Sequence, residues 1–443
     1  MVETNQLPGA EHTEVGSYFV ANYPPFSLWT QDAVKSDALP ALMHRPADVP
    51  LGLYLHIPFC RKRCHFCYYR VYTGKNADEV SEYLDMLGRE WELYSTQPAV
   101  AGRPLRFIYF GGGTPSFLSV RQLRSLVERL SKVAPWTDAE EITFECEPGT
   151  LTEPKLRAIR DMGITRLSLG IEHFDDDILE LNGRAHRSAE VFRAYQFARS
   201  LDFPQVNIDL IAGMLGDSDK KWHAAVEQTI GLSPDSVTIY QMELPYNTTI
   251  SNDLLEGAGQ FHESVADWST KRRWVQEAFD ALEEAGYSVG SAYTAVKDPK
   301  KTQFIYRDQL WQGADLAALG VASFGHINGI HMQNLDNWGS YAASVQRGEI
   351  PLNRAFRPTD QERLIREFVL QLKLGTIRPA YFRSKYKVDV VARFAGALNS
   401  LTNDGYLRAA DADQIELTRE GLLRVDSLLP RFFLPEHLNL RYT

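Results

Sequence analysis

The sequence contains little cysteine, no long apolar segment and no excess of basic residues. Only four of its 443 residues are cysteines, namely Cys60, Cys64, Cys67 and Cys146. Three of them lie so close together that they make a poor disulfide framework but a suitable set of metal ligands. A chain of this length buries a large hydrophobic core without disulfides, so we expect the cysteine cluster to serve a function.

The same absences exclude several classes of protein. No apolar run approaches the roughly 18–20 residues that span a bilayer, and residues 1–16 lack the basic-then-apolar pattern of a signal peptide. The 57 acidic residues exceed the 47 basic ones and give a net charge of −10. This balance argues against general nucleic-acid binding, which depends on phosphate neutralisation by Lys and Arg. We expect a cytoplasmic protein without a membrane span or a nucleic-acid partner.

Short apolar runs alternate with amphipathic segments between about residue 51 and residue 250. The alternation predicts six strands, at 51–56, 105–110, 141–146, 166–170, 205–211 and 236–240. Mostly apolar strands separated by helices are typical of βαβ units around a buried parallel sheet. The predicted fold is therefore α/β, with a parallel sheet that could close partly into a barrel.

The unusual polar and glycine-rich segments all fall where a predicted strand ends. Cys60 follows the first strand, residues 111–114 follow the second, and residues 145–148 end the third. Residues 170–172 end the fourth strand, and Asp209 lies near the end of the fifth. In such folds the functional site lies at the carboxyl ends of the strands. We therefore expect one site at this edge of the sheet.

The remaining segments suggest four parts of the chain. The prolines and aromatics of residues 22–29 predict an extended arm laid over a surface. Near the C-terminus, two predicted helices precede a short two-stranded ribbon, which is typical of a winged-helix-like module. We divide the chain into an arm (1–48), a core (49–250), a substrate-covering extension (251–355) and a C-terminal domain (356–443).

The spacing Cys60-x3-Cys64-x2-Cys67 provides three ligands in one loop. A structural zinc site takes four ligands, and the fourth would have to be His56, His65 or Cys146. Three thiolates also suit an iron–sulfur cube in which one iron is left without a cysteine and can bind a small molecule. The spacing favours the iron–sulfur cube, and zinc stays open as the alternative.

The cysteine motif, with Phe66 before its last cysteine, resembles the signature of the radical S-adenosylmethionine (SAM) enzymes. The string that precedes it, residues 53–60, resembles the branch with oxygen-independent coproporphyrinogen III oxidases, HemW heme chaperones and related methylases and cyclopropanases. Segments 110–116, 184–186, 207–211 and 315–323 match that branch as well. The resemblance covers nearly the whole chain from about residue 23. It implies a partial parallel (β/α)6 barrel of radical SAM type with a small C-terminal winged-helix-like α+β domain.

The resemblance also implies the cofactors and partners. A 4Fe–4S cluster would be held by Cys60, Cys64 and Cys67, and its fourth iron would bind the amino and carboxylate groups of SAM. Reductive cleavage of SAM then gives methionine and a 5′-deoxyadenosyl radical. The implied partners are a tetrapyrrole substrate and a one-electron donor such as flavodoxin or ferredoxin, and the implied state is a monomer.

Ten residues are expected to contact the cofactors by this resemblance: Tyr54, Phe66, Gly112, Gly113, Thr114, Glu145, Glu172, Arg184, Asp209 and Phe324. Glycines allow close backbone approach, and Arg184 could pair with a carboxylate through two hydrogen bonds. Asp209 lies in an apolar strand, where a carboxylate needs a partner such as a ribose hydroxyl. The alternatives are surface ion pairs for the charged residues and core packing for Tyr54 and Phe66.

Four residues are candidates for catalysis: Tyr69, Glu172, His173 and His326. Members of this branch usually have Gln where Glu172 stands, and His173 follows it directly. Coproporphyrinogen oxidases typically have a fourth cysteine where Tyr69 stands, which weakens that assignment. His326 and His331 lie in a glycine-rich segment, where they could bind a substrate or act as an acid.

Three functions are compatible with the motifs. The first is oxidative decarboxylation of tetrapyrrole propionates, and the second is a methylase or cyclopropanase that binds a second SAM. The third is a heme chaperone of HemW type, which is disfavoured because the His-Asn-x-x-Tyr-Trp string of that group is missing. The nearest segment, residues 306–311, keeps two aromatics and lacks the His-Asn pair. We therefore favour an enzyme of the coproporphyrinogen oxidase type.

Overall fold

A parallel sheet forms the centre of the molecule. The computed structural model describes residues 13–16, 20–46, 48–257, 265–438 and 440, so most of the polar leader at residues 1–16 lies outside the described residues. The sheet contains β1 (Leu51–Ile57), β2 (Leu105–Gly112), β3 (Glu141–Cys146), β4 (Arg166–Glu172), β5 (Gln205–Ala212) and β6 (Ser236–Gln241). These strands pair in chain order and all run parallel. The six strands and the parallel topology predicted from the sequence are confirmed.

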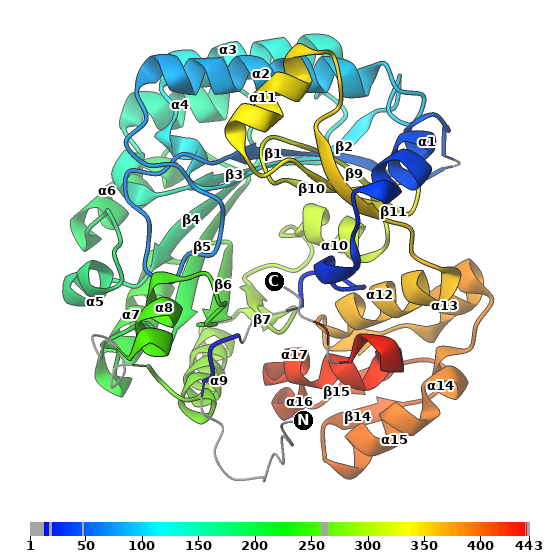
Figure 1. The fold of residues 1–443 in the computed structure, drawn as a ribbon. Coiled ribbons are helices and arrows are strands. Elements are labelled where there is room, and N and C mark those ends of the chain that lie inside the picture. The colour runs from blue at the N-terminus through cyan, green and yellow to red at the C-terminus, as the bar shows by residue number, and fades with distance from the viewer. Residues whose placement is uncertain (1–12, 17–19, 47, 258–264, 439, 441–443) are drawn as a thin grey trace.

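Residues 251–355 extend the sheet at both edges. Beside β1 lie the parallel strand β9 (Asp315–Leu319) and then β10 (Phe324–Ile327), β11 (Ile330–Asn334) and β12 (Leu352–Phe356), which are antiparallel. Beside β6 lie β8 (Thr294–Val296) and β7 (Ser288–Val289), also antiparallel. The result is one open, 12-stranded, curved sheet (Figure 1). The segment predicted to cover the substrate thus contributes largely to the sheet itself.

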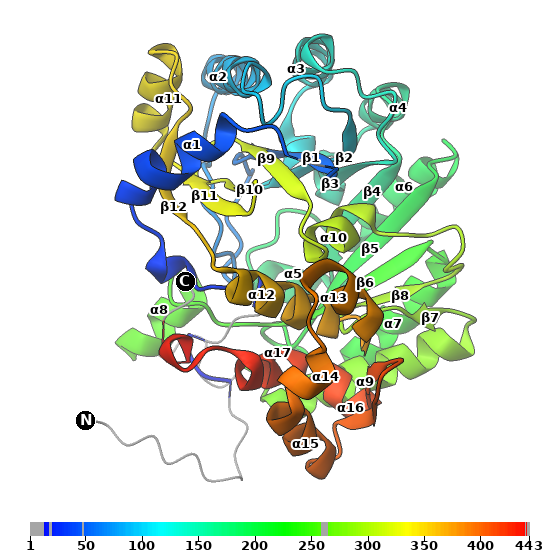
Figure 2. The same ribbon diagram turned by 90° about the vertical axis from the view of Figure 1, so that its right-hand side faces the viewer.

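Most helices pack on the outside of the curved sheet (Figures 1 and 2). They are α2 (Ala77–Ser95), α3 (Val120–Val133), α4 (Glu153–Asp161), α5 (Asp176–Leu181), α6 (Ser188–Arg199), α7 (Asp219–Leu232), α9 (Trp268–Glu284) and α11 (Trp338–Gln346). Helix α8 (Thr249–Glu256) lies beside the loop after β1, and α10 (Ile305–Trp311) packs inside the curve of the sheet against Phe107. Capping boxes at Asn76 and Ser119 begin α2 and α3, because each side chain accepts a hydrogen bond from the third residue of its helix. The apolar faces of these helices and the strands between them form one large core.

The C-terminal domain has its own hydrophobic cluster around Phe368, which packs against Phe394 and Phe432. Its helices are α12 (Asp360–Leu372), α13 (Pro379–Tyr386), α14 (Val390–Arg393), α15 (Ala395–Asn403), α16 (Arg419–Leu423) and α17 (Val425–Leu428). A small antiparallel sheet is formed by β13 (Thr376–Ile377), β14 (Leu407–Ala410) and β15 (Ile415–Leu417). Helices with a small ribbon match the predicted winged-helix-like domain.

The N-terminal arm is buried, whereas the sequence predicts that it lies over a surface. Tyr23 is fully buried, and its hydroxyl lies 2.7 Å from His437 Nδ1. Trp29 is also buried and stacks on His331. The arm continues into α1 (Leu39–Leu42), which packs on the core of the large sheet. The aromatics of the arm are therefore core residues that join the sheet to the C-terminal domain.

None of the helices in the described part of the chain has both the length and the apolar character required to cross a bilayer.

Candidate active site

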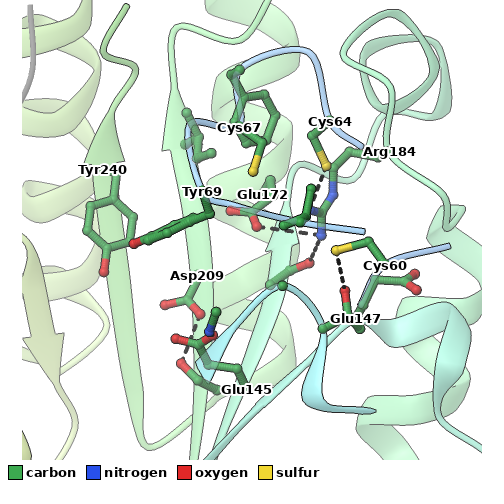
Figure 3. A pocket seen from close by; sticks show the side chains of 18 of the residues that line it. Cys60, Cys64, Cys67, Tyr69, Glu145, Glu147, Glu172, Arg184, Asp209 and Tyr240 are labelled. Atoms are coloured by element: carbon green, nitrogen blue, oxygen red, sulfur yellow. Dashed lines mark hydrogen bonds and ion pairs between the residues drawn. The ribbon is translucent and has the colours of Figure 1, made fainter. Parts of the chain in front are cut away.

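A cavity of about 300 Å³ lies inside the curve of the sheet. Its upper wall is the loop after β1 that carries Cys60, Cys64 and Cys67, and its other walls are the inward-facing residues of β2 to β6. Figure 3 shows the three cysteine side chains, from one loop, around a common space that Glu172 also faces, with Asp209 lower in the view. The predicted convergence of motifs at one edge of the sheet is thus realised as a cavity.

Backbone hydrogen bonds hold the cysteine loop at its base and in its middle. At its base, the Cys60 amide donates to Tyr72 O (3.1 Å) and the Tyr72 amide donates to Pro58 O (2.6 Å). In the middle, the His65 amide donates to Asn182 O (3.0 Å), and His65 Nδ1 lies 2.9 Å from Leu181 O. His65 therefore binds the C-terminal end of α5, and these contacts fix the loop that carries the cysteines.

The turn after β2 approaches the cysteine loop closely. A Cβ atom at Gly113 would lie 2.9 Å from Ile57 O and 3.0 Å from Cys60 Sγ, so no side chain fits there. Gly112 has a φ of +110°, a conformation that favours glycine. The Thr114 hydroxyl donates to Cys60 Sγ at 3.4 Å. The glycines thus allow backbone and hydroxyl groups to reach the cysteine cavity.

Arg184 connects the cysteines to the end of β4. Its Nη1 donates to Cys64 Sγ (3.4 Å), and its Nη2 lies 3.5 Å from Glu172 Oε1. Glu172 has a φ of +65° at a register shift between β4 and β5. A bulge of this kind re-aims a side chain, and here it directs the carboxylate into the cavity (Figure 3).

Two further carboxyl groups face the cavity from neighbouring strands. Glu145 accepts hydrogen bonds from the Tyr109 hydroxyl (2.7 Å) and the Gly112 amide (3.2 Å). Asp209 accepts from Ser168 Oγ and from Asn207 Nδ2, both at 2.8 Å. Burial raises the pKa of Glu145 to about 7, and burial also raises the pKa of Asp209. These groups favour a ligand that brings positive charge or hydrogen-bond donors.

The pKa of Glu172 is raised like that of Glu145, whereas the pKa of Glu147 is lowered. Burial raises the pKa of Glu172 to about 7, although Arg184 opposes the shift. At Glu147, burial is outweighed by hydrogen bonds from His186 and Arg61, which lower the pKa of this carboxyl to about 2. Arg61 binds both oxygens of Glu147, at 2.8 and 3.1 Å. Glu147 is therefore an ionised anchor that ties the cysteine loop to the end of β3.

Most of the residues predicted for the site line this cavity. They are Cys60, Cys64, Phe66, Cys67, Tyr69, Gly112, Gly113, Thr114, Glu145, Glu172, Arg184 and Asp209. Tyr54 does not line the cavity itself. It lies behind the cavity residue Tyr109, on which it stacks, and packs against Phe107 and Leu316. The structure brings the predicted residues together, and their individual roles stay predictions.

Three predicted residues, His173, His326 and Phe324, do not line this cavity, contrary to the expected convergence. His173 is buried against Asp217 (3.5 Å), and its Nδ1 accepts from the Asp175 amide. His326 lies on β10, where its Nδ1 is 2.9 Å from His331 Nδ1 and burial lowers its pKa. Phe324 packs on Phe26 of the arm. The aromatic arm packs on this hairpin, which separates His326 and Phe324 from the cysteine cavity, and their roles stay predictions.

The sequence analysis missed several cavity residues. Tyr109, Arg166, Ser168, Thr238 and Tyr240 lie on strands, whereas Glu147 follows β3 and Phe304 precedes α10. Arg166, Ser168 and Gly170 alternate along β4, so the period of two in a strand would place them on one face. An arginine at the start of an otherwise apolar buried strand was the available signal.

The residues present fit an iron–sulfur cluster and SAM. Three thiols face one cavity, and burial raises the pKa of Cys60 to about 11 and of Cys67 to about 12. A metal must therefore displace protons from these thiols when it binds. Because residue 113 is glycine, no side chain enters the space beside Cys60 Sγ, and a ligand can occupy it. Among the described residues, no group of three or more His, Cys, Asp or Glu is spaced to hold a single metal ion.

Comparison with known proteins identifies the class. Residues 54–229 match the model of the Radical SAM superfamily, so the chain carries a radical SAM domain, as its motifs predict. The predicted cofactors of this domain, a 4Fe–4S cluster and SAM, are confirmed with it.

Within this class, the chain is similar over most of its length to two groups of proteins. It is 27% identical over 447 residues to an oxygen-independent coproporphyrinogen III oxidase of Pseudomonas aeruginosa, covering 95% of this chain and 94% of the relative. It is 26% identical over 375 residues to the heme chaperone HemW of Bacillus subtilis, covering 84% and 96%. The solved structure of coproporphyrinogen III oxidase (HemN) from Escherichia coli shares the fold, with a TM-score of 0.81 at 23% identity over 93% of this chain and 96% of that one.

Proposed function

We propose that this protein is a radical SAM enzyme that oxidatively decarboxylates the propionate side chains of a tetrapyrrole. The observation that carries the proposal is the single cavity on which the three cysteines, Arg184 and the buried carboxyl groups converge. The relatives named coproporphyrinogen III oxidase support the substrate class, because they match nearly the full length of the chain.

The bound cofactors supply an electron and a 5′-deoxyadenosyl radical that can remove a hydrogen atom from a substrate. Loss of a β-hydrogen atom from a propionate, followed by loss of carbon dioxide and transfer of one electron to an acceptor, leaves a vinyl group. The protein's task is to hold the reactants in position and to keep water out. A cavity inside the sheet meets both needs.

The chain's own residues have distinct tasks in this proposal. Arg184 offers a buried cation beside Cys64, where it offsets thiolate charge and can bind a carboxylate. Glu145 and Asp209 accept hydrogen bonds and suit an ammonium group or ribose hydroxyls. Cys60, Cys64 and Cys67 would hold the cluster, and Thr114 donates a hydrogen bond to the first of these sulfurs.

The aromatic walls of the cavity suit a substrate with pyrrole rings. Tyr69, Tyr109, Tyr240 and Phe304 line it together. Tyr240 projects towards Tyr69, which stacks on Tyr68 with ring centroids 4.4 Å apart (Figure 3). Tyr69 stands where coproporphyrinogen oxidases typically have a fourth cysteine, so this wall is aromatic in the present protein.

The test is an anaerobic incubation of the reduced, cluster-loaded protein with SAM and coproporphyrinogen III. We expect 5′-deoxyadenosine, carbon dioxide and mono- and divinyl products, and none of them from the Cys64→Ala variant. Formation of 5′-deoxyadenosine without vinyl products would overturn the proposed substrate but keep SAM cleavage.

Two other results would replace the proposal. Transfer of deuterium from a labelled SAM methyl group into 5′-deoxyadenosine would identify a methylase or cyclopropanase. Stable heme binding without any SAM cleavage would identify a chaperone like HemW. Either result would contradict the proposed decarboxylation, and the two results are distinguishable from each other.

A further inference from the structure

Arg166 is a buried cation with an unfilled hydrogen-bonding position. It begins β4 and lines the cavity, yet only 2% of its surface is exposed. Its Nη1 atom is buried without a hydrogen-bond partner among the described residues. Glu141 and Asp209 offset the charge, but a buried N–H group without an acceptor is costly, so this arrangement indicates a ligand.

The position of Arg166 separates it from the cysteine end of the cavity. Arg166, Ser168 and Gly170 all line the cavity from β4, and Gly170 is the residue whose carbonyl accepts from Arg184. Four residues of a strand span about 13 Å. Arg166 therefore lies at the floor of the cavity, well below the groups expected to hold the cluster.

The carboxylates nearest Arg166 already have other hydrogen-bond donors. Glu141 accepts from the amides of Ile305 (2.9 Å) and Tyr306 (3.2 Å). Asp209 accepts from Ser168 and Asn207. The Arg166 guanidinium instead lies over the Phe304 ring, 4.2 Å from its centroid. Such stacking orients the guanidinium and leaves its N–H groups available to an acceptor.

We infer that Arg166 and Phe304 form a carboxylate subsite at the floor of the cavity. A planar guanidinium matches a carboxylate through two parallel hydrogen bonds, and the aromatic ring gives the subsite an apolar side. The carboxylate belongs either to a substrate side chain or to the methionyl group of a SAM molecule. In the first case the inference rests on the proposed function, and Arg166 selects substrates with a carboxylate on an arm long enough to reach the floor.

The binding test uses coproporphyrin III, its tetramethyl ester and SAM as three separate probes on the cluster-loaded protein. For Arg166→Met we expect an affinity loss of about 30-fold for coproporphyrin III and no loss for the uncharged ester. A comparable loss for SAM alone would assign the subsite to a methionyl carboxylate. Unchanged affinity for both coproporphyrin III and SAM would overturn the subsite.

A second variant separates the paired geometry of Arg166 from its charge. Arg166→Lys keeps the charge but not the paired geometry, so its affinity should lie between those of the wild type and Arg166→Met. Without ligand, its unfolding midpoint should stay close to that of the wild type, because Glu141 and Asp209 keep a cation beside them. Wild-type affinity of Arg166→Lys for both coproporphyrin III and SAM would overturn the paired-carboxylate subsite.

Arg103 provides the matched control for the stability measurement. It is also a buried arginine, but it forms an ion pair with Asp315 at 2.8 Å. Arg103→Met should therefore lower the midpoint, because it leaves Asp315 buried and unpaired. If the wild type binds neither coproporphyrin III nor, under anaerobic conditions, coproporphyrinogen III, the proposed substrate fails, while the SAM arm still decides the subsite.

Discussion

At the residue scale, the chemistry of the site depends on cations placed among buried acids. Arg184 approaches Cys64 and Glu172, whereas Arg187, three residues later, pairs with Glu180 at the surface. The difference arises from the segment between α5 and α6, which turns Arg184 inward. Charge-assisted hydrogen bonds in such a buried setting are strong, while exposed ion pairs contribute little.

Replacing Arg184 with Met is expected to weaken SAM binding by about 10- to 100-fold, since a buried partner for a carboxylate is lost. Equilibrium binding of SAM to the cluster-loaded protein measures the effect, and iron content shows that the cluster is retained. Arg187→Met is the control and should leave the affinity unchanged. Equal affinities for both variants would remove Arg184 from the SAM site.

The sequence predicts the residues at the strand ends well and the interior residues poorly. Cys60, Gly113 and Glu145 follow from motifs next to apolar runs, and the structure places them together. His326 lies outside the cavity because it pairs with His331 in a hairpin that Trp29, from a distant part of the chain, packs on. Arg166 was missed because the cavity that it lines forms only when the sheet folds.

At the element scale, Glu90 of α2 joins three other segments inside the core. Its carboxyl accepts from the Tyr341 hydroxyl (2.6 Å), the Asn334 amide (2.6 Å) and the Gly320 backbone amide (2.8 Å). Helix α2 is thereby connected to β11, α11 and the turn after β9. Burial outweighs these donors and raises the pKa of Glu90 to about 7.

A raised carboxyl pKa predicts a loss of stability as the pH increases. The native state holds the Glu90 proton up to about pH 7, whereas an unfolded Glu releases it near 4.5. The stabilisation is therefore complete below pH 4.5 and is lost as the pH rises to 7. From pH 5 to pH 8, the wild type should lose about 1–3 kcal/mol of unfolding free energy relative to Glu90→Gln. Urea denaturation measures both, and parallel pH profiles would contradict the prediction.

The six parallel strands are predictable because each is a local apolar run, and their order follows the chain. The edge strands are not predictable in this way. Strands β7 and β8 have only two and three residues, β10 carries His326, and β11 carries His331 and Gln333. Their pairing depends on neighbours that are distant in sequence, so no local pattern indicates it.

At the scale of the whole molecule, the arm joins the sheet to the C-terminal domain. Tyr23 accepts a hydrogen bond from the Leu434 amide at 3.1 Å and packs on Phe433 with ring centroids 4.8 Å apart. Trp29 packs on the hairpin of the sheet at the other end of the same arm. The arm therefore contributes to the stability of two separate hydrophobic clusters.

Tyr23→Ala should destabilise the protein by about 3–5 kcal/mol, as expected for a large aromatic side chain removed from a core. Thermal unfolding measures the change, and limited proteolysis should cut the arm faster in the variant. Tyr246→Ala, at a partly exposed tyrosine, is the comparison and should change the midpoint little. Equal midpoints for the two variants would show that the arm does not stabilise the fold.

The central claim is that Cys60, Cys64 and Cys67 hold a cluster with one iron open to SAM. The most direct measurement is the metal content of anaerobically prepared protein together with 5′-deoxyadenosine formation from SAM. We predict about four iron and four sulfide per chain, with nucleoside formation abolished when any one of the three cysteines is replaced by alanine. Bound zinc without sulfide, or nucleoside formation that persists in a cysteine variant, would contradict the account.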